Sequence, residues 1–208
     1  MRGKAIVTPL VDGLIARETG TRTSTTSPLR VNEVDLSGVT GPATSGGHLA
    51  ITFLPGKKLD GWTGPHWRDL DTDVALLKRS GVDTLFLLVE DAELEGAMVL
   101  DLPKALEGAA IDLVRFPIRD PHVPTDPPAF RAAVRDMLGR VRAGRSVAVA
   151  CRGGIDRSGM AAACILREAG LDAPAAIDRV HIAREHTLTR EDGLEYVRGW
   201  PMGTHASP

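Results

Sequence analysis

Residues 147–159 read VAVACRGGIDRSG and place a cysteine, an arginine and a serine where an apolar run gives way to glycines. Cys151 ends the apolar run, and Arg157 and Ser158 follow it in the same short segment. A cysteine thiolate is a nucleophile, and a guanidinium can hold two oxygens of one phosphate in a planar fork. This pattern indicates nucleophilic chemistry on a phosphate group.

The residues between Cys151 and Arg157 are typical of an anion-binding loop. Two glycines let successive backbone N–H groups face inward, and the N-terminus of the following helix adds its positive end to the same field. That field favours a thiolate at Cys151, and Ser158 is placed to hydrogen-bond the sulfur when it leaves. The expected loop consists of Arg152, Gly153, Gly154, Ile155 and Asp156.

Cleavage of a phosphate ester also needs an acid that protonates the leaving oxygen. The segment FPIRDPHVP offers Asp120 in a proline-rich loop after an expected strand. The alternative for Asp120 is a local turn cap before Pro121. Asp126 is a competing acid, but its position before Pro127 is more easily explained as a helix N-cap.

The remaining sequence predicts an α/β fold, with a central and largely parallel sheet flanked by helices. Short apolar runs that are closed by turn residues alternate with segments of helical periodicity. In such a sheet, ligands bind beyond the carboxyl ends of the strands, which is where Cys151 would lie. We expect strands within 48–56, 82–90, 108–118 and 146–150, and helices within 70–81, 127–144, 158–170, 173–185 and 189–200.

Composition limits the classes of partner and cofactor. The chain has 208 residues, 43% of them hydrophobic, and a formal net charge of -2 from 25 basic and 27 acidic residues. This mixture gives no basic stripe for nucleic acid or a membrane surface. The two cysteines and six histidines show no metal-ligand spacing, so we expect no metal and no cofactor, and Cys164 as a core residue. Without an apolar segment of signal or membrane-spanning length, we expect a cytoplasmic protein.

Two parts of the chain differ in composition. Residues 1–30 end in a Thr/Ser-rich stretch with Gly and Pro and are expected to form a loosely packed arm, and residues 31–208 a single domain. Within that domain, Lys57 and Lys58 could attract a phosphorylated ligand, and Arg68 and Asp69 are expected to pair and cap at a helix start.

Three segments in order resemble cysteine-dependent dual-specificity and tyrosine phosphatases of the kinase-associated phosphatase (cyclin-dependent kinase inhibitor-like) type. The nine residues CRGGIDRSG resemble the signature of such phosphatases, in which Cys and Arg-Ser are separated by five residues. The longer segment that begins at LAITFLPG, together with FPIRDPHVP and CRGGIDRSGMAAACILREAG, extends the resemblance over roughly residues 48–199.

The resemblance implies hydrolysis of phosphotyrosine, and of phosphoserine or phosphothreonine, through a phosphocysteine without metal. The substrate would be a phosphorylated protein or a small phosphomonoester. By the same resemblance Cys151 is the nucleophile, Arg157 the phosphate clamp, Ser158 the helper of the leaving thiolate and Asp120 the general acid.

Two positions depart from the family pattern. Ala150 stands where the family commonly has a histidine that holds the loop and activates the thiol, so we expect weaker turnover. Asp156 puts a carboxylate beside a site for dianions, and the loop has no lysine. Polyphosphorylated inositol lipids are therefore less favoured as substrates.

Two alternatives stay open at this stage. The loop could bind a phosphorylated partner without turnover, for which the loss of the histidine at Ala150 leaves room. A rhodanese-like sulfurtransferase shares a cysteine loop and the α/β order, but it does not explain Asp120 or the longer family-like segments.

Overall fold

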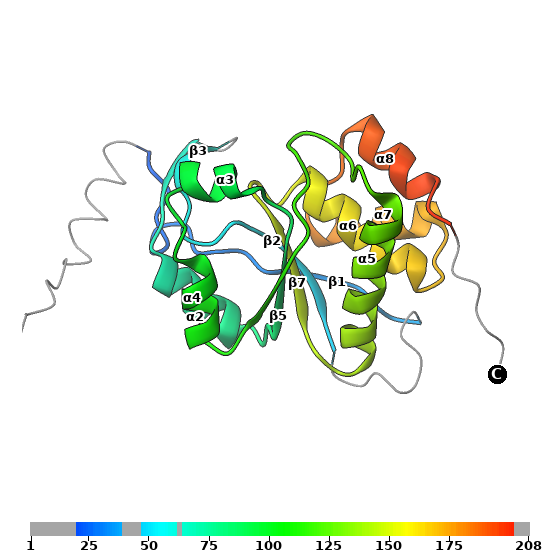
Figure 1. Cartoon of the computed structure of the whole chain (residues 1–208), viewed down its shortest axis with the longest axis horizontal. Helices are drawn as coiled ribbons and strands as arrows, with labels where there is room; N and C mark the ends of the chain where they lie inside the picture. Colours follow the sequence, from blue (N-terminus) through cyan, green and yellow to red (C-terminus); the bar gives the residue numbers. More distant parts are fainter. Residues whose placement is uncertain (1–19, 39–46, 62–63, 202–208) are drawn as a thin grey trace, which may run out of the picture.

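The computed structural model of the chain describes residues 20–38, 47–61 and 64–201 (Figure 1). Residues 1–19 of the expected arm and residues 202–208 of the expected domain lie outside these ranges. No helix within the described ranges combines the length and the hydropathy needed to cross a bilayer.

A five-stranded sheet in the order β1-β2-β7-β5-β6 forms the centre of the fold. All neighbouring strands pair in parallel except β1, which runs antiparallel to β2. The central strand β7 is buried along its whole length because β2 and β5 flank it and helices cover both faces. The strands are β1 (Asn32–Val34), β2 (Leu49–Phe53), β5 (Thr84–Leu87), β6 (Asp112–Arg115) and β7 (Val147–Cys151).

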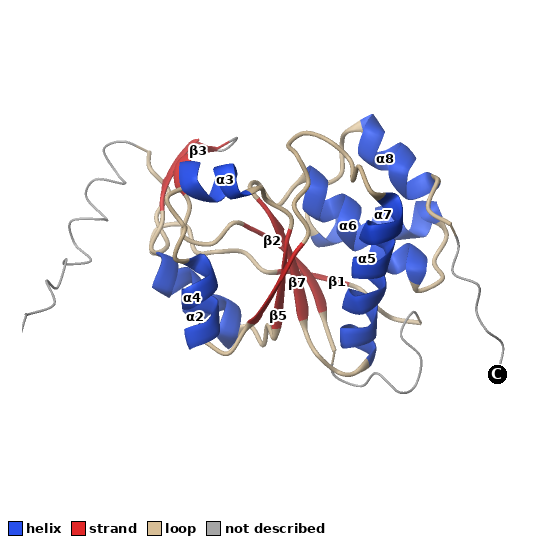
Figure 2. Cartoon of the chain, in the orientation of Figure 1, coloured by secondary structure: helices blue, strands red, loops and turns tan. Residues whose placement is uncertain are grey.

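Two layers of helices sandwich this sheet, and each layer has its own core (Figure 1, Figure 2). The first layer contains α5 (Pro127–Arg142), α6 (Asp156–Glu168), α7 (Ala173–Ala183) and α8 (Glu191–Arg198). The second layer contains α2 (Leu70–Arg79), α3 (Asp91–Gly96) and α4 (Leu102–Gly108). This arrangement confirms the predicted α/β class with a largely parallel sheet.

Five elements were not anticipated from the sequence. The hairpin of β3 (Lys58–Gly61) and β4 (Gly64–Trp67), the edge strand β1, and the helices α3 and α4 are short. Such elements carry too few residues for a clear apolar period and are held by tertiary contacts, for example between the Lys58 N–H and the Ala97 carbonyl at 2.9 Å.

The described part of the arm, residues 20–30, packs on the domain, which differs from the loose packing that its composition indicates. The Arg22 N–H donates to the Pro65 carbonyl at 2.8 Å, and Leu29 lies in the core of the second helix layer. Thr23 and Thr26 hydrogen-bond to each other within the arm, and the Ser24 hydroxyl donates to the Asp69 carbonyl of the domain. The single domain over 31–208 stays a prediction.

A buried ion pair ties α2 to the turn that precedes Lys57. The Arg68 guanidinium donates to both carboxylate oxygens of Asp73 at 2.7 and 2.8 Å, and both side chains are buried. The same carboxylate accepts the Gly56 N–H at 2.9 Å. Asp69 caps α2 by accepting the Thr72 N–H at 2.7 Å, as expected. The start of α2 is therefore held both by its own N-cap and by the buried pair that binds the turn at Gly56.

We predict that Asp73→Ala lowers the free energy of unfolding by about 3–5 kcal/mol, because it leaves the Arg68 charge buried without a partner. Asp71→Ala, on the exposed face of the same helix, should cost less than about 1 kcal/mol. Urea denaturation measures both values. Equal losses for the two variants would show that the buried pair does not hold this corner.

Candidate active site

Cys151 is the last residue of β7, and its sulfur faces the loop that leads into α6. The Gly154 N–H donates to the Cys151 sulfur at 3.2 Å, and the Ser158 hydroxyl lies 3.3 Å from it. Only 3% of Cys151 is exposed. The thiol therefore lies at the floor of the loop, with one backbone amide and one hydroxyl directed at it.

Gly154 has a backbone conformation that explains its residue type. Its φ angle is +66°, a region that residues with a Cβ rarely adopt, and a Cβ built there would lie 2.6 Å from the Thr52 carbonyl oxygen. The loop thus crosses directly over the end of β2, which lets it turn back toward the sulfur. Gly153 has no such restriction, since the nearest atom to its Cβ would be 3.5 Å away.

Arg157 is anchored along one edge of its guanidinium. Nη1 and Nη2 each donate to one carboxylate oxygen of Glu93 at 2.7 Å, and Nη1 also donates to the Ile118 carbonyl at 2.8 Å. Burial opposes the charge, yet the pKa of Arg157 is raised because the Glu93 carboxylate and the Cys151 sulfur favour it. Of the five N–H donors of a guanidinium, the Nε donor and one on Nη2 make no hydrogen bond within the described residues. They lie side by side as a fork for two phosphate oxygens, with Asp120 Oδ1 3.5 Å from Nε.

Glu93 on α3 was not identified from the sequence. Burial disfavours its charge, but the hydrogen bonds from Arg157 and a backbone bond at Glu90 bring its pKa below the usual value. No apolar period or motif spacing marks this residue, because α3 is only six residues long and follows β5 directly. Its place in a family-like segment was the only available signal.

Asp120 lies over the loop, as the sequence predicted. Its Oδ2 is 2.9 Å from Nη2 of Arg152, and its Oδ1 is 3.5 Å from Nε of Arg157. The side chain is 32% exposed, so it faces both the loop and the solvent. The structure thus brings Cys151, Arg157 and Asp120 together. Asp126 is the N-cap of α5, where it accepts the Ala129 N–H at 3.0 Å.

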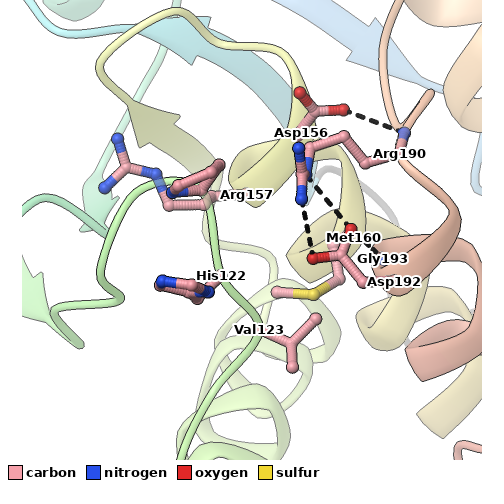
Figure 3. Close-up of a pocket in the computed structure, with 9 residues that line it drawn as sticks. His122, Val123, Asp156, Arg157, Met160, Arg190, Asp192 and Gly193 are labelled. Atoms are coloured by element: carbon pink, nitrogen blue, oxygen red, sulfur yellow. Dashed lines mark hydrogen bonds and ion pairs between the residues drawn. The ribbon is translucent and has the colours of Figure 1, made fainter.

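Asp156 points away from the thiol. Its Oδ1 accepts the backbone N–H groups of Thr189 at 3.0 Å and Arg190 at 3.3 Å, which fixes the segment before α8. Figure 3 shows Arg157 reaching away from the cluster formed by Asp156, Arg190 and Asp192. The carboxylate that the sequence placed beside the anion site therefore binds backbone amides on the other side of the loop.

Two cations outside the loop brace its carbonyl groups. Nζ of Lys57 donates to the Arg152 carbonyl at 3.1 Å, and Nη2 of Arg184 donates to the Gly153 carbonyl at 3.3 Å. Burial and the nearby arginines lower the pKa of Lys57 to about 8, although the charge of Cys151 acts in the other direction. Arg184, at the end of α7, carried no signal in the sequence.

Ala150 and Cys164, which the sequence analysis singled out, both lie in the core. Ala150 is buried in the core on the α2–α4 side of β7, one residue before the thiol. Cys164 is fully buried in α6, and burial raises the pKa of its thiol well above the usual value, which fits a core residue. Within the described ranges, no three His, Cys, Asp or Glu side chains gather as metal ligands.

We predict that Gly154→Ala destabilises the fold by about 1–3 kcal/mol more than Gly153→Ala, because only the first substitution strains φ and collides with backbone. Thermal unfolding of both variants measures this difference. If the two variants unfold at the same temperature, the close crossing of the loop over β2 is not a structural requirement.

The fold of this chain is similar to that of several solved phosphatases. A kinase associated phosphatase with its catalytic-site cysteine changed to serine superposes with a TM-score of 0.72 at 22% identity, covering 82% of this chain and 93% of that chain. Tk-PTP in its active form gives 0.59 at 21% identity, covering 80% and 94%. PTPMT1 in complex with PI(5)P gives 0.58 at 20% identity, covering 73% and 88%. At these identities the likeness shows the fold. No curated protein matches this chain.

The family is shown by the sequence match over residues 65–206, which covers more than half of the chain. This family, PTP-SAK, is described as Swiss Army Knife proteins with a DSP-PTPase phosphatase domain. The match spans the Asp120 loop and the whole of CRGGIDRSG. The chain therefore belongs to the PTP-SAK family and carries a cysteine-dependent phosphatase domain of the dual-specificity and protein-tyrosine type.

Proposed function

We propose that this chain hydrolyses phosphomonoesters, including phosphotyrosine and phosphoserine or phosphothreonine of proteins, through a phosphocysteine at Cys151. The observation that carries the proposal is a buried Cys151 sulfur approached by the Gly154 amide and the Ser158 hydroxyl, with the guanidinium of Arg157 held by Glu93 near enough to feel the charge of that sulfur. A phosphate dianion that enters this loop meets the amides and the guanidinium fork at the point where the nucleophile lies.

In the first step the Cys151 thiolate attacks phosphorus, and the bond between phosphorus and the ester oxygen breaks. Asp120 gives its proton to the leaving oxygen, because an alkoxide is a poor leaving group near neutral pH. Arg157 holds two phosphoryl oxygens while negative charge spreads over them. Its orientation is set by Glu93, which occupies the opposite edge of the guanidinium.

In the second step water attacks the phosphocysteine. Asp120, now a carboxylate, takes a proton from that water, and the bond between sulfur and phosphorus breaks to release phosphate. The Ser158 hydroxyl stabilises the departing thiolate by a hydrogen bond over the observed 3.3 Å. The remaining loop residues, Arg152, Gly153, Gly154, Ile155 and Asp156, supply the backbone that encloses the phosphate.

A second candidate function is phosphate binding without turnover. The observation in its favour is Ala150, whose methyl group lies in the core and offers the loop no hydrogen bond. The two functions differ in a single assay, because a binding module retains affinity for vanadate but releases no phosphate.

We predict that the purified chain hydrolyses p-nitrophenyl phosphate, that vanadate inhibits this reaction, and that Cys151→Ser lowers kcat by at least about 10⁴-fold, since oxygen at that position is not ionised. Release of p-nitrophenol measures the rate. Cys164→Ser, in the core of α6, is the matched control and should keep the active loop intact. A wild-type protein that binds vanadate without turnover would favour the binding module.

We predict that Asp120→Asn slows hydrolysis of an alkyl phosphate or phosphoserine peptide by about 10²–10⁴-fold in kcat/KM, which reports the first step. An aryl phosphate with an activated leaving group should lose much less, because its oxygen leaves without a proton. Asp126→Asn, at the N-cap of α5, is the control. Equal losses on both substrates would assign the acid role to another residue.

A further inference from the structure

A second pocket adjoins the catalytic loop on the side of the β2–β3 turn. It has a volume of about 730 Å³ and is walled by the arm, the end of β2, the loop itself and the segment after α7. It shares Gly153 and Ile155 with the loop, whereas Cys151, Arg157 and Asp120 are not among its lining residues. The pocket is therefore distinct from the thiol site but shares one wall with it.

Four cationic side chains line this pocket: Arg22, Arg30, Lys57 and Arg184. Within the described residues, none of them forms an ion pair with a carboxylate, and the guanidinium groups of Arg22 and Arg30 make no hydrogen bond there. Two carboxylates also line the pocket. The Asp156 carboxylate accepts the backbone N–H groups of Thr189 and Arg190 before α8, and Glu185 is exposed.

Lys57 and Arg184 are held close to other positive charges, which costs electrostatic free energy. Lys57 is only 4% exposed and lies 4.5 Å from the centre of the Phe53 ring, with Arg68 and Arg184 over the same ring at 4.9 and 5.9 Å. Like charges that are gathered in a buried place repel one another, and a bound anion relieves this repulsion. Lys57 and Arg184 also donate to loop carbonyls, whereas Arg22 is half-buried and Arg30 is exposed, which leaves their guanidinium groups accessible to a ligand.

We propose that this pocket binds a second phosphate group of the substrate, and that the substrate is a compact small molecule with two phosphates. One phosphate would lie at Cys151, as the proposed function requires, and the other among Arg22, Arg30, Lys57 and Arg184. The volume is within the range of small-molecule sites, and all four cations line this one pocket beside the loop.

The pocket also changes an argument from the sequence against polyphosphorylated substrates. A carboxylate at Asp156 and the absence of lysine from the loop disfavour such substrates. The Asp156 carboxylate lines this pocket but accepts two backbone amides before α8, and Lys57 reaches the loop from the β2–β3 turn, 95 residues away in the chain. The charge that the loop lacks is supplied by residues that only the fold brings beside it.

The test is calorimetric binding to the full chain carrying Cys151→Ser, which binds but does not turn over. Fructose 1,6-bisphosphate should bind at least about 10-fold more tightly than fructose 6-phosphate, well beyond the roughly twofold statistical advantage of two phosphates. Adding Arg30→Ala or Arg22→Ala should reduce this ratio by about 5-fold or more. Arg79→Ala, an exposed arginine on α2, is the matched control and should leave the ratio unchanged.

A ratio within about twofold, or a ratio that both pocket variants leave intact, would overturn the assignment. Selectivity that is confined to doubly over singly phosphorylated peptides would replace the small molecule with a phosphoprotein. Selectivity that is confined to phosphatidylcholine vesicles with phosphatidylinositol 4-phosphate would replace it with a lipid. The proposed function is tested by a different assay, the turnover of p-nitrophenyl phosphate by the wild-type chain. The two proposals can therefore fail independently, because the binding ratio needs no catalysis.

Discussion

The bidentate pair between Arg157 and Glu93 is the interaction on which the site depends. A buried guanidinium would be costly alone, and the Glu93 carboxylate and the Ile118 carbonyl compensate it along one edge. This pairing fixes which donors remain, and the Nε edge that is left faces Asp120 Oδ1 at 3.5 Å, where the proposed phosphate and general acid would meet. Preorganised donors of this kind need not reorient when charge develops during phosphoryl transfer.

The loop itself is held mainly from outside. Gly154 passes over the end of β2, Lys57 and Arg184 bind two loop carbonyls, and Asp156 is tied to the segment before α8. Four distant parts of the chain thus maintain the curvature that directs an amide at the sulfur. These contacts hold the loop without any contribution from Ala150, whose methyl group is buried in the core on the α2–α4 side of β7.

Much of this arrangement could be predicted from the sequence, because it depends on local patterns. The apolar run that ends at Cys151, the paired glycines and the position of Arg157 indicate a strand, an anion-binding turn and a clamp within a few residues. Glu93 and Arg184 could not be predicted. They reach the loop only through packing of α3 and α7, and nothing in their local sequence distinguishes them from surface charges. The short elements β1, β3, β4, α3 and α4 escape prediction for the same reason.

The most direct test of the account is whether phosphate becomes bonded to Cys151. The Asp120→Asn variant should be mixed with p-nitrophenyl phosphate, quenched in acid within the first turnovers, digested and analysed by mass spectrometry. We expect the mass of one phosphoryl group on the peptide that contains Cys151 and none on the peptide that contains Cys164. A phosphoryl group on another residue, or steady turnover with no covalent species at any quench time, would contradict it.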